Sequence, residues 1–224
     1  MATSNSVDFN MTARDVITFA LRKINLLDEN EEVGAGMADR AKTAMNAMLK
    51  GWQKHPNLWR MTEGSVTLIA GTYSYALSPH PHRVITARYR DANTRDLPME
   101  EMSRDDYYDR PLKSATGIPT EYYVDYQRAA ATIYFLNVPA SITTETVKYT
   151  FLRKFEDIDD LSNDIDIRQE HFEMTGYKLA SILADDYGRT GGAIDRIIAR
   201  AEAMFNSALD DDRGGFIQFV PGYR

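Results

Sequence analysis

Residues 37–70 read MADRAKTAMNAMLKGWQKHPNLWRMTEGSVTLIA, and the hydrophobic period changes within this stretch. In its first half the apolar residues recur every three or four positions, which predicts a helix from about Met37 to Lys54. His55-Pro56-Asn57 ends that helix, because proline disfavours helical geometry in the residue before it. From Val66 onward apolar and polar residues alternate, which predicts β-strands. The chain therefore changes from helical to β structure near residue 62.

A second helix is predicted upstream of this stretch, from Thr12 to Leu27. Its apolar residues share one helical face: Val16, Ile17, Ala20, Leu21, Ile24 and Leu27. Thr12 and Asp15 have the spacing of a capping pair, in which each side chain bonds the other residue's backbone amide.

The β pattern continues from Glu63 to Lys154. Six runs rich in β-branched and aromatic residues are separated by turn signals: 66–70, 73–75, 84–89, 122–126, 132–136 and 147–151. Short strands at this spacing are typical of a small antiparallel sheet or sandwich.

Helical period returns after the acidic stretch Glu156–Asp166. One helix is predicted from Phe172 to Tyr187, and Asp166 with Gln169 has the pattern of a capping box. A further helix is predicted over residues 193–209, after the glycine pair at 191 and 192.

These elements predict an α+β fold, a four-helix bundle interrupted by an inserted antiparallel β-sheet or sandwich module. The predicted boundaries are 1–62 for the first half of the bundle, 63–154 for the β module and 155–209 for the second half. Residues 210–224, DDDRGGFIQFVPGYR, predict an extended C-terminal arm.

The composition excludes several classes of protein. The chain has no cysteine, which excludes disulfides, thiolate metal sites and a cysteine nucleophile. A formal charge of −7 argues against a broad surface that grips nucleic-acid phosphates. No secretory signal and no apolar run of about 20 residues is visible, so we expect a soluble protein made in the cytoplasm, with no membrane partner.

Three groups of residues invite a reading as chemical sites. His80-Pro81-His82 has the form of a metal-ligand pair, but a proline turn with surface histidines is the commoner meaning of such a pattern. The acidic stretch fails the EF-hand spacing, because Ile165 stands where glycine is required and His171 where glutamate is. Paired carboxylates for acid/base work are the third candidate: Glu100, Glu101, Asp105 and Asp106. We expect no catalytic residue, metal or cofactor.

Tyrosines are concentrated in the β module, and half-apolar rings with a polar tip suit both sheet packing and protein interfaces. The set is Tyr73, Tyr75, Tyr89, Tyr107, Tyr108, Tyr122, Tyr123, Tyr126, Tyr134 and Tyr149. Packing accounts for most of them, and any subset that faces outward would make the module a contact surface.

Several segments, taken in order, resemble the head-to-tail adaptor proteins of short-tailed bacteriophages, also described as packaged-DNA stabilisation or tail accessory factors. The resemblance is carried by ALRKIN at 20–25, AMNAMLKGW at 44–52 with Leu58-Trp59, VTLIAG at 66–71 with Tyr73-Ser74-Tyr75, GIPTEY at 117–122, and YTFLR at 149–153 with Asp157. It covers residues 11–209. One departure is that Arg168 and Phe172 stand where similar chains have a proline and a tryptophan opening the third helix.

The resemblance implies a structural virion protein without catalytic residues. Such proteins form a ring, here of twelve copies, under the portal at the head-tail junction of the virion. The ring extends the DNA channel, retains packaged DNA and attaches tail nozzle or tail fibre proteins. Double-stranded DNA passes through it without sequence-specific binding.

Two sets of site residues are predicted. The C-terminal arm is expected to be flexible in the free subunit and to bind the portal through Arg213, Gly214, Gly215, Phe216, Ile217, Phe219, Val220 and Tyr223. Subunit contacts are expected at Met37, Met45, Met48, Met204 and Phe205, because methionine gives adaptable apolar surface.

Two other functions stay open at this point. One is a tail-tube or nozzle-side ring protein of the same virion. The other is a peptidoglycan hydrolase that uses paired carboxylates such as Glu100 and Asp105.

Overall fold

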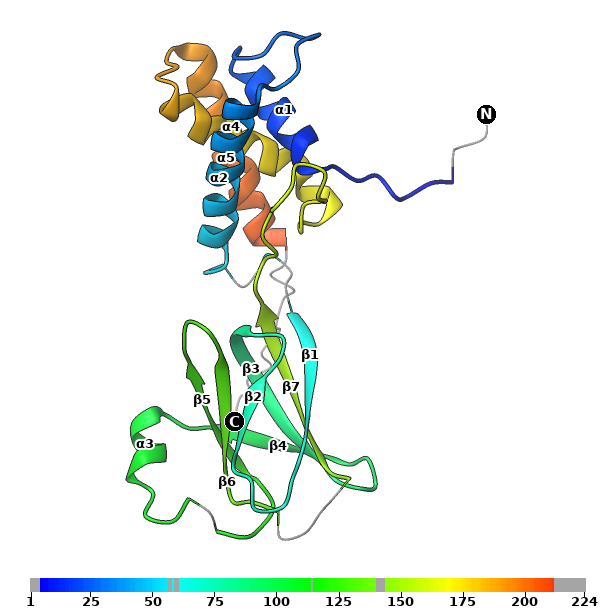
Figure 1. The fold of residues 1–224 in the computed structure, drawn as a ribbon, viewed down its shortest axis with the longest axis vertical. Coiled ribbons are helices and arrows are strands. Elements are labelled where there is room, and N and C mark those ends of the chain that lie inside the picture. Colours follow the sequence, from blue (N-terminus) through cyan, green and yellow to red (C-terminus); the bar gives the residue numbers. More distant parts are fainter. Residues whose placement is uncertain (1–4, 56–57, 59–60, 114, 140–143, 212–224) are drawn as a thin grey trace, which may run out of the picture. The chain divides into compact units, whose positions relative to one another are not determined.

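The computed structural model describes residues 5–55, 58, 61–113, 115–139 and 144–211. Contacts divide the chain into two compact units: Met1–Trp59 with Phe155–Arg224, here called the helical unit, and Arg60–Lys154, here called the β unit. Figure 1 shows that helices make up the first and that strands dominate the second, so the fold class is mixed α+β. None of the helices in the described ranges has the length and apolar character needed to cross a membrane.

Within its described residues the helical unit contains four α-helices and one short 3-10 helix. Their bounds are α1 Ala13–Lys23, α2 Ala35–Trp52, η1 Gln169–His171, α4 Phe172–Asp186 and α5 Gly192–Asp211. The predicted capping pair is confirmed at α1: the amide of Asp15 donates to the Thr12 hydroxyl at 3.3 Å, and the amide of Thr12 donates to the Asp15 carboxylate at 3.0 Å.

The predicted capping box at Asp166 and Gln169 is wrong. The 3-10 turn η1 comes first, with Arg168 at its N-cap and no hydrogen bond from the cap side chain. The Asp166 carboxylate instead accepts the backbone amide of Glu156 at 3.1 Å. The carboxylate that the pattern assigned to the helix end therefore accepts a hydrogen bond from a loop amide.

Helix α4 lies at the centre of the helical unit, because it contacts α1, α2 and α5. All four helices contribute to one core, which includes Ile17, Leu21, Leu49, Leu179 and Leu183. Each such side chain, fully removed from water, stabilises the fold by about 1.5–3 kcal/mol. The regular geometry of a four-helix bundle stays a prediction.

In the part of the β unit that the structure describes there are seven strands and one short helix. Their bounds are β1 Met61–Thr67, β2 Ser74–Leu77, β3 Pro81–Arg90, β4 Asp96–Glu101, α3 Arg104–Asp109, β5 Glu121–Tyr126, β6 Ala131–Leu136 and β7 Thr146–Arg153. The sheet order is β1-β7-β3-β4-β5-β6-β2.

One strand pair differs from the predicted antiparallel arrangement. Strands β4 and β5 are parallel, with Glu100 opposite Glu121 and Glu101 opposite Tyr122. Two parallel neighbours need a crossover connection, and the chain makes it here through α3. The remaining pairs are antiparallel.

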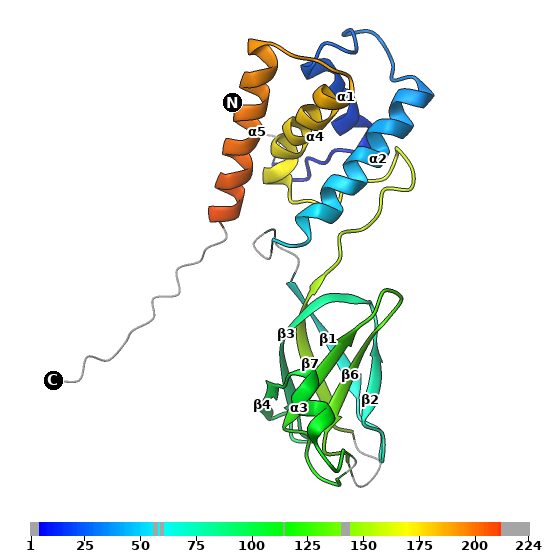
Figure 2. The same cartoon turned by 90° about the vertical axis from the view of Figure 1, so that its left-hand side faces the viewer.

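The sheet curls around a single core, as Figures 1 and 2 show. Edge strands β1 and β2 contribute Val66 and Leu77 to the same buried cluster, although they lie at opposite ends of the strand order. Their connection is held by the Tyr75 hydroxyl, which accepts the amide of Ile69 at 2.9 Å. One face of each strand is therefore buried inside the curl, and the other is left for contacts outside it.

Candidate interaction surface

An aromatic layer covers the outer face of strands β5 and β6. Side chains alternate along a strand, so Tyr122 and Val124 enter the core while Tyr123 points outward, and Tyr134 does the same on β6. The Tyr123 and Tyr134 rings stack with centroids 5.8 Å apart and planes 22° apart. This face of the sheet is therefore aromatic instead of polar.

Helix α3 completes the layer with two further tyrosines. The Tyr107 ring stacks on Tyr123 at 5.5 Å and lies 5.4 Å from Tyr134. Tyr108 meets Tyr107 edge to face at 5.5 Å, and Tyr73 stacks on Tyr134 at 6.4 Å. We call these five residues, Tyr73, Tyr107, Tyr108, Tyr123 and Tyr134, the tyrosine cluster.

Local sequence explains why a helix of only six residues forms here. The Ser103 hydroxyl accepts the amide of Asp106 at 3.1 Å, and Asp105 and Asp106 lie in the first turn, where carboxylates are favoured. At the other end the Lys113 ammonium donates to the carbonyls of Tyr108 and Arg110 at 3.1 and 2.9 Å. Capped at both ends, α3 holds its tyrosines on the sheet.

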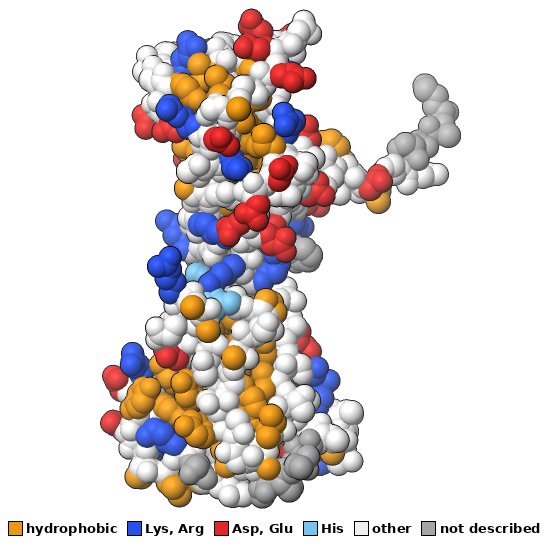
Figure 3. Space-filling view, viewed as in Figure 1, with side chains coloured by type: hydrophobic (Ala, Val, Ile, Leu, Met, Phe, Trp, Pro, Cys, Tyr) orange, Lys and Arg blue, Asp and Glu red, His pale blue; other side chains and the backbone are white. Residues whose placement is uncertain are grey.

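The cluster has a buried floor and an exposed rim. Tyr107 is 2% exposed, whereas Tyr108 is 52% and Tyr73 42% exposed. Lys113 lies 5.8 Å and Arg104 5.5 Å from the Tyr108 ring centroid, within the range of cation–π attraction. Figure 3 shows hydrophobic side chains gathered over α3 and the neighbouring strands. Rigid aromatic rings beside cations are typical of protein-binding surfaces.

Three hydroxyls of the tyrosine cluster, those of Tyr107, Tyr123 and Tyr134, have a raised pKa. Burial raises the pKa of Tyr107 to about 12, and it also raises the pKa of Tyr123 and of Tyr134. These phenols are therefore protonated and uncharged near neutral pH. Each can still donate a hydrogen bond, as the Tyr123 hydroxyl does to Asp125 at 3.4 Å.

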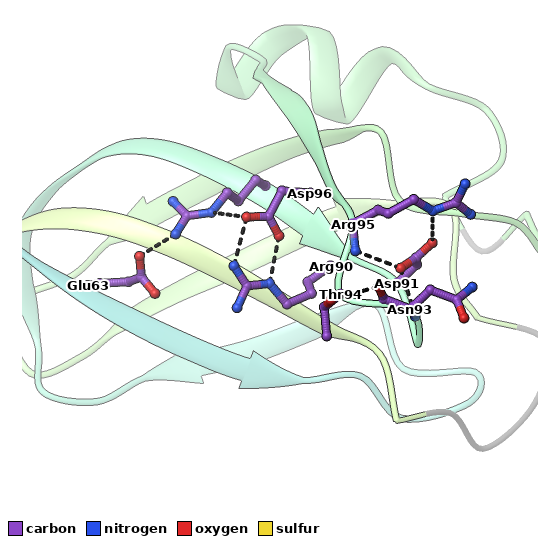
Figure 4. A network of polar contacts seen from close by, with 8 residues as sticks. Glu63, Arg90, Asp91, Asn93, Thr94, Arg95 and Asp96 are labelled. Atoms are coloured by element: carbon purple, nitrogen blue, oxygen red, sulfur yellow. Dashed lines mark hydrogen bonds and ion pairs between the residues drawn. The ribbon is translucent and has the colours of Figure 1, made fainter.

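Arg88 and Arg90 on β3 are paired with carboxylates from β4 and β1 (Figure 4). Arg90 Nε and Nη2 donate to the two Asp96 carboxylate oxygens at 2.6 and 2.7 Å, and Arg88 Nε donates to Asp96 at 3.0 Å. Arg88 also pairs with Glu63 on β1. Hydrogen bonds from Arg90 lower the pKa of Asp96 to about 2. This network links strands β1, β3 and β4, and it leaves Arg88 and Arg90 little capacity to bind phosphates.

The candidate catalytic carboxylates are only partly brought together. Glu100, Glu101 and Asp106 line one open hollow of about 370 Å³, together with Asp109, Arg110 and Glu121. Asp105 does not line it, so the predicted pair of Glu100 and Asp105 does not share that hollow. Asp106 also accepts the Ser103 hydroxyl at 2.6 Å as part of the α3 cap.

The acidic stretch after β7 is attached to helix α2 by hydrogen bonds and an ion pair. Lys50 on α2 donates to the carbonyl of Phe155 at 2.6 Å and pairs with Asp157 at 2.6 Å. Asn46 exchanges two hydrogen bonds of 2.9 Å with the backbone of Ile158. The Asp160 carboxylate accepts the amide and hydroxyl of Ser162 at 2.8 and 2.7 Å. These hydrogen bonds and the ion pair hold the loop in its conformation.

The histidine pair at positions 80 and 82 also lies in the β unit. His80 Nε2 lies 3.0 Å from the carbonyl of Gln127, and His82 is exposed on β3. Among the described residues no group of three or more histidines and carboxylates is placed to hold a metal ion.

The predicted subunit-contact residues lie in or against the helical core. Met45, Met48 and Phe205 are buried within the chain, and the Phe205 ring lies 5.3 Å from Trp52. Met37 and Met204 are half-buried and keep some exposed surface. The eight residues predicted for the portal-binding arm, from Arg213 to Tyr223, lie outside the described residues.

Sequence reasoning missed α3 and its role in the tyrosine cluster. The signal was present in SRDDYY at 103–108, where a serine cap precedes two acidic residues and two tyrosines. It also missed the exposed apolar residues Val7 and Phe9 before α1.

Comparison with known proteins gives one family. The family model described as SU10 adaptor protein matches residues 11–216. No curated protein matches the chain.

The solved structures that are similar to the chain include three at low identity. "Neck of native GTA particle computed with C12 symmetry" matches at 15% identity and TM-score 0.30, covering 84% of this chain and 93% of that one. "Neck of empty GTA particle computed with C6 symmetry" matches at 16% and 0.32 with the same coverage. "Virion of native gene transfer agent (GTA) particle" matches at 15% and 0.31, covering 86% and 93%. Scores this low support no conclusion about function.

Proposed function

This chain belongs to the SU10 adaptor protein family, and we propose that it is a head-to-tail adaptor, a structural subunit of the virion made in the host cytoplasm. Copies of the chain, twelve in number, assemble as a ring under the portal protein. The ring extends the DNA channel, retains packaged DNA and attaches tail nozzle or tail fibre proteins. The ring acts through its shape and its contacts with other proteins, and it needs no catalytic residue.

The observation that carries this proposal is the extent of the family match. It runs from residue 11 to residue 216, across the helical unit, the β unit and the start of the C-terminal segment. A match confined to one unit would support a shared domain only. A match over both supports the adaptor role for the chain as a whole.

The tyrosine cluster supports the attachment of tail proteins. Tyr108 and Tyr73 expose aromatic surface on a floor held rigid by Tyr107 and Tyr123. Aromatic rings that already pack on one another lose less side-chain freedom when a partner binds, which lowers the entropic cost of binding. We assign this surface to a tail component with an apolar or aromatic anchor.

Contacts between subunits are assigned to the helical unit. Of the five predicted residues, Met37 and Met204 keep exposed surface that a neighbour can cover. Met45, Met48 and Phe205 are buried inside their own chain, so they support an interface by packing beneath it.

Contact with the portal is assigned to the C-terminal arm, predicted as residues 210–224. Asp210 and Asp211 are the last two residues of helix α5, and residues 212–224 lie outside the described residues. Burying Phe216, Ile217, Phe219 and Val220 on the portal yields roughly 6–12 kcal/mol gross. Fixing this length of backbone costs on the order of 15–30 kcal/mol. The arm therefore needs main-chain hydrogen bonds from its partner as well, as in strand addition to a sheet edge.

DNA is expected to pass the ring without being held. The chain carries a formal charge of −7, and Arg88 and Arg90 are paired with carboxylates. Binding of duplex DNA by counterion release would then be weak at physiological salt. Tight, salt-sensitive DNA binding by the purified chain, well below micromolar, would count against this part of the proposal.

The proposal is tested by mixing the purified chain with portal rings and, separately, with nozzle protein. An adaptor forms a stable complex with portals and then recruits nozzle protein to it. Binding to nozzle protein without binding to portals would favour the alternative, a nozzle-side ring protein. Clearing of a peptidoglycan suspension, lost on Glu100→Gln and Asp105→Asn, would favour the hydrolase.

A further inference from the structure

The exposed rim of the tyrosine cluster carries two positive charges. The Arg104 guanidinium lies 5.5 Å from the centroid of the Tyr108 ring, and the Lys113 ammonium lies 5.8 Å from the same centroid. Because Tyr108 is 52% exposed, a partner that covers its ring also comes close to both cations. We call Tyr73, Tyr108, Arg104 and Lys113 together the exposed rim.

Within the described residues, neither cation of the rim is paired with a carboxylate. Lys113 donates to two backbone carbonyls at 3.1 and 2.9 Å, and the contact of Arg104 is with the Tyr108 ring. Other arginines of the β unit do pair with carboxylates, namely Arg88, Arg90, Arg95 and Arg110. The two cations of the rim can therefore pair with a partner without breaking an ion pair of the protein.

Two carboxylates belong to the same surroundings. The Asp125 carboxylate already accepts the side-chain amide of Gln127 at 2.9 Å and the Tyr123 hydroxyl at 3.4 Å. Asp105 follows Arg104 in the first turn of α3 and is exposed. Neither carboxylate forms an ion pair with the cations of the rim, so the positive charge beside the Tyr108 ring is retained.

Helix α3 carries opposite charge on its two sides. At about 100° per residue, Arg104 and Tyr108 lie on one side of the helix, and Asp106 and Asp109 lie on the other. The second side lines the hollow of about 370 Å³, whose other carboxylates are Glu100, Glu101 and Glu121. Arg110 also lines this hollow and is paired with Glu121 at 3.4 Å. The helix thus separates an aromatic, positively charged surface from an acidic hollow.

Apolar area accompanies the two cations. Tyr73 is 42% exposed and stacks on Tyr134, and Leu112, which precedes Lys113 in the chain, is 63% exposed. Figure 3 shows Lys or Arg side chains next to the hydrophobic surface over α3. A partner matches this surface when it brings an apolar side chain to the rings and an anionic group to the cations.

A protein carboxylate fits these charges better than nucleic acid does. Bases can also stack on aromatic rings beside arginine, so single-stranded nucleic acid is the other anionic ligand for such a surface. A chain of phosphates would also approach the acidic hollow on the other side of α3, which repels it. A single carboxylate needs only the two cations of the rim.

We propose that the exposed rim binds a segment of the tail component in which an aspartate or glutamate stands beside an apolar or aromatic side chain. The apolar side chain covers the Tyr108 ring, and the carboxylate pairs with Arg104 and Lys113. This inference rests on the proposed function, which supplies a tail component as the partner, and it adds the chemistry by which that partner is recognised.

Three short peptides with one tryptophan each test the proposal on the free chain. They are acetyl-Glu-Trp-Glu-amide, acetyl-Gln-Trp-Gln-amide and acetyl-Lys-Trp-Lys-amide. Binding is followed by NMR titration of the full chain with ¹³C-labelled tyrosine rings, in which Tyr108→Phe identifies the Tyr108 signal. We expect the acidic peptide to shift this signal and to bind about tenfold more tightly than the basic one. Salt at about 0.5 M should remove most of that difference, because it screens exposed charges.

Arg104→Glu is the diagnostic variant. It places a carboxylate in the first turn of α3, where the helix dipole favours it, so the fold should be kept. The substitution should lower the affinity for the acidic peptide by about tenfold and raise the affinity for the basic one. The matched control is Arg128→Glu, which changes an exposed arginine between β5 and β6, outside the rim. It should leave both affinities within about twofold.

Several results overturn the proposal. They are equal affinity for the acidic and basic peptides, equal effects of Arg104→Glu and Arg128→Glu, and no binding of any peptide at millimolar concentration. An oligothymidylate of about ten nucleotides that shifts the Tyr108 signal and binds more tightly than the acidic peptide also overturns it. These titrations need neither portal nor ring, so their failure leaves ring assembly intact. The proposed function fails separately, if no ring forms on portals.

The tail component itself gives a second measurement. Rings of Arg104→Glu assembled on portals should bind nozzle protein about tenfold more weakly than rings of the unsubstituted chain. Rings of Arg128→Glu should bind it normally. Complete Arg104→Glu rings that bind nozzle protein as tightly as unsubstituted rings contradict the proposal and leave the ring assembly of the proposed function standing.

Discussion

At the scale of single residues, Gly176 shows how closely the helices are fitted. A Cβ placed on it would lie 2.5 Å from Cδ1 of Phe19, a distance that requires the ring or a helix to move. Gly176→Ala should therefore destabilise the helical unit by about 1–3 kcal/mol through overpacking. Both tryptophans lie outside residues 61–154, so urea unfolding followed by tryptophan fluorescence reports on the helical unit.

The control for this substitution is Gly51→Ala in α2, where nothing lies within 4 Å of the added methyl group. It should stabilise the helix by about 0.5–1 kcal/mol, because alanine loses less backbone entropy than glycine. Equal effects of the two substitutions would mean that Phe19 does not pack against Gly176 as described.

Asp96 gives a prediction about pH. Its pKa in the folded protein is lowered to about 2 by hydrogen bonds from Arg90, and an unfolded aspartate has a pKa of about 3.9. A lowered pKa stabilises the fold above the unfolded value, and the benefit is lost as pH falls from about 4 to about 2. The difference in urea midpoint between wild type and Asp96→Asn should be present at pH 7 and shrink across that window. A difference that does not change between pH 7 and pH 2 contradicts it.

At the scale of secondary-structure elements, helix α3 carries one tyrosine that packs on the sheet and one that is exposed for contact with a partner. Tyr107 and Tyr108 are neighbours in the chain, yet one is buried on the sheet and the other faces solvent. Tyr107→Ala should cost about 3–5 kcal/mol of stability, as removal of a buried aromatic ring does. Tyr108→Ala should change stability by less than about 1 kcal/mol and weaken binding of the tail component. Thermal unfolding and binding of nozzle protein to assembled rings check both, and unchanged binding by Tyr108→Ala would remove the tyrosine cluster from the proposed interface.

The elements that could be predicted from sequence are those whose apolar period matches their packing. The helices around Val16, Met45, Leu179 and Ala201 were predicted within a few residues, because each has one buried face. Strand β4 was not predicted, because only Met99 of its six residues is buried and the rest carry no alternating signal.

The other differences between prediction and structure depend on contacts between segments that are separated in the sequence. Asp166 bonds a loop amide instead of a helix end, and sequence spacing does not reveal which donor will be nearer. The buried positions of Met45 and Phe205 depend on how α2 and α5 meet, so a methionine pattern alone did not distinguish core from interface. The sequence predicted that outward-facing tyrosines of the β module would form a contact surface. It did not predict which tyrosines these are, because helix α3, which carries Tyr107 and Tyr108, was not predicted.

At the scale of the whole molecule, two compact units in one chain allow one to assemble while the other binds partners. The C-terminal arm is expected to join the ring to the portal. Deleting residues 213–224 should leave the unfolding transition unchanged and abolish assembly on portals, because the arm is proposed to act on the portal alone. A truncated chain that still forms complete, salt-stable rings on portals would contradict this assignment.

The central claim is that the chain acts as a closed ring on the portal. Native mass spectrometry of the purified complex between the chain and its portal counts the copies directly. We predict one dominant mass that corresponds to a complete ring of twelve chains on each portal. A complex with one or two chains per portal, or a broad distribution without a closed species, would contradict the account.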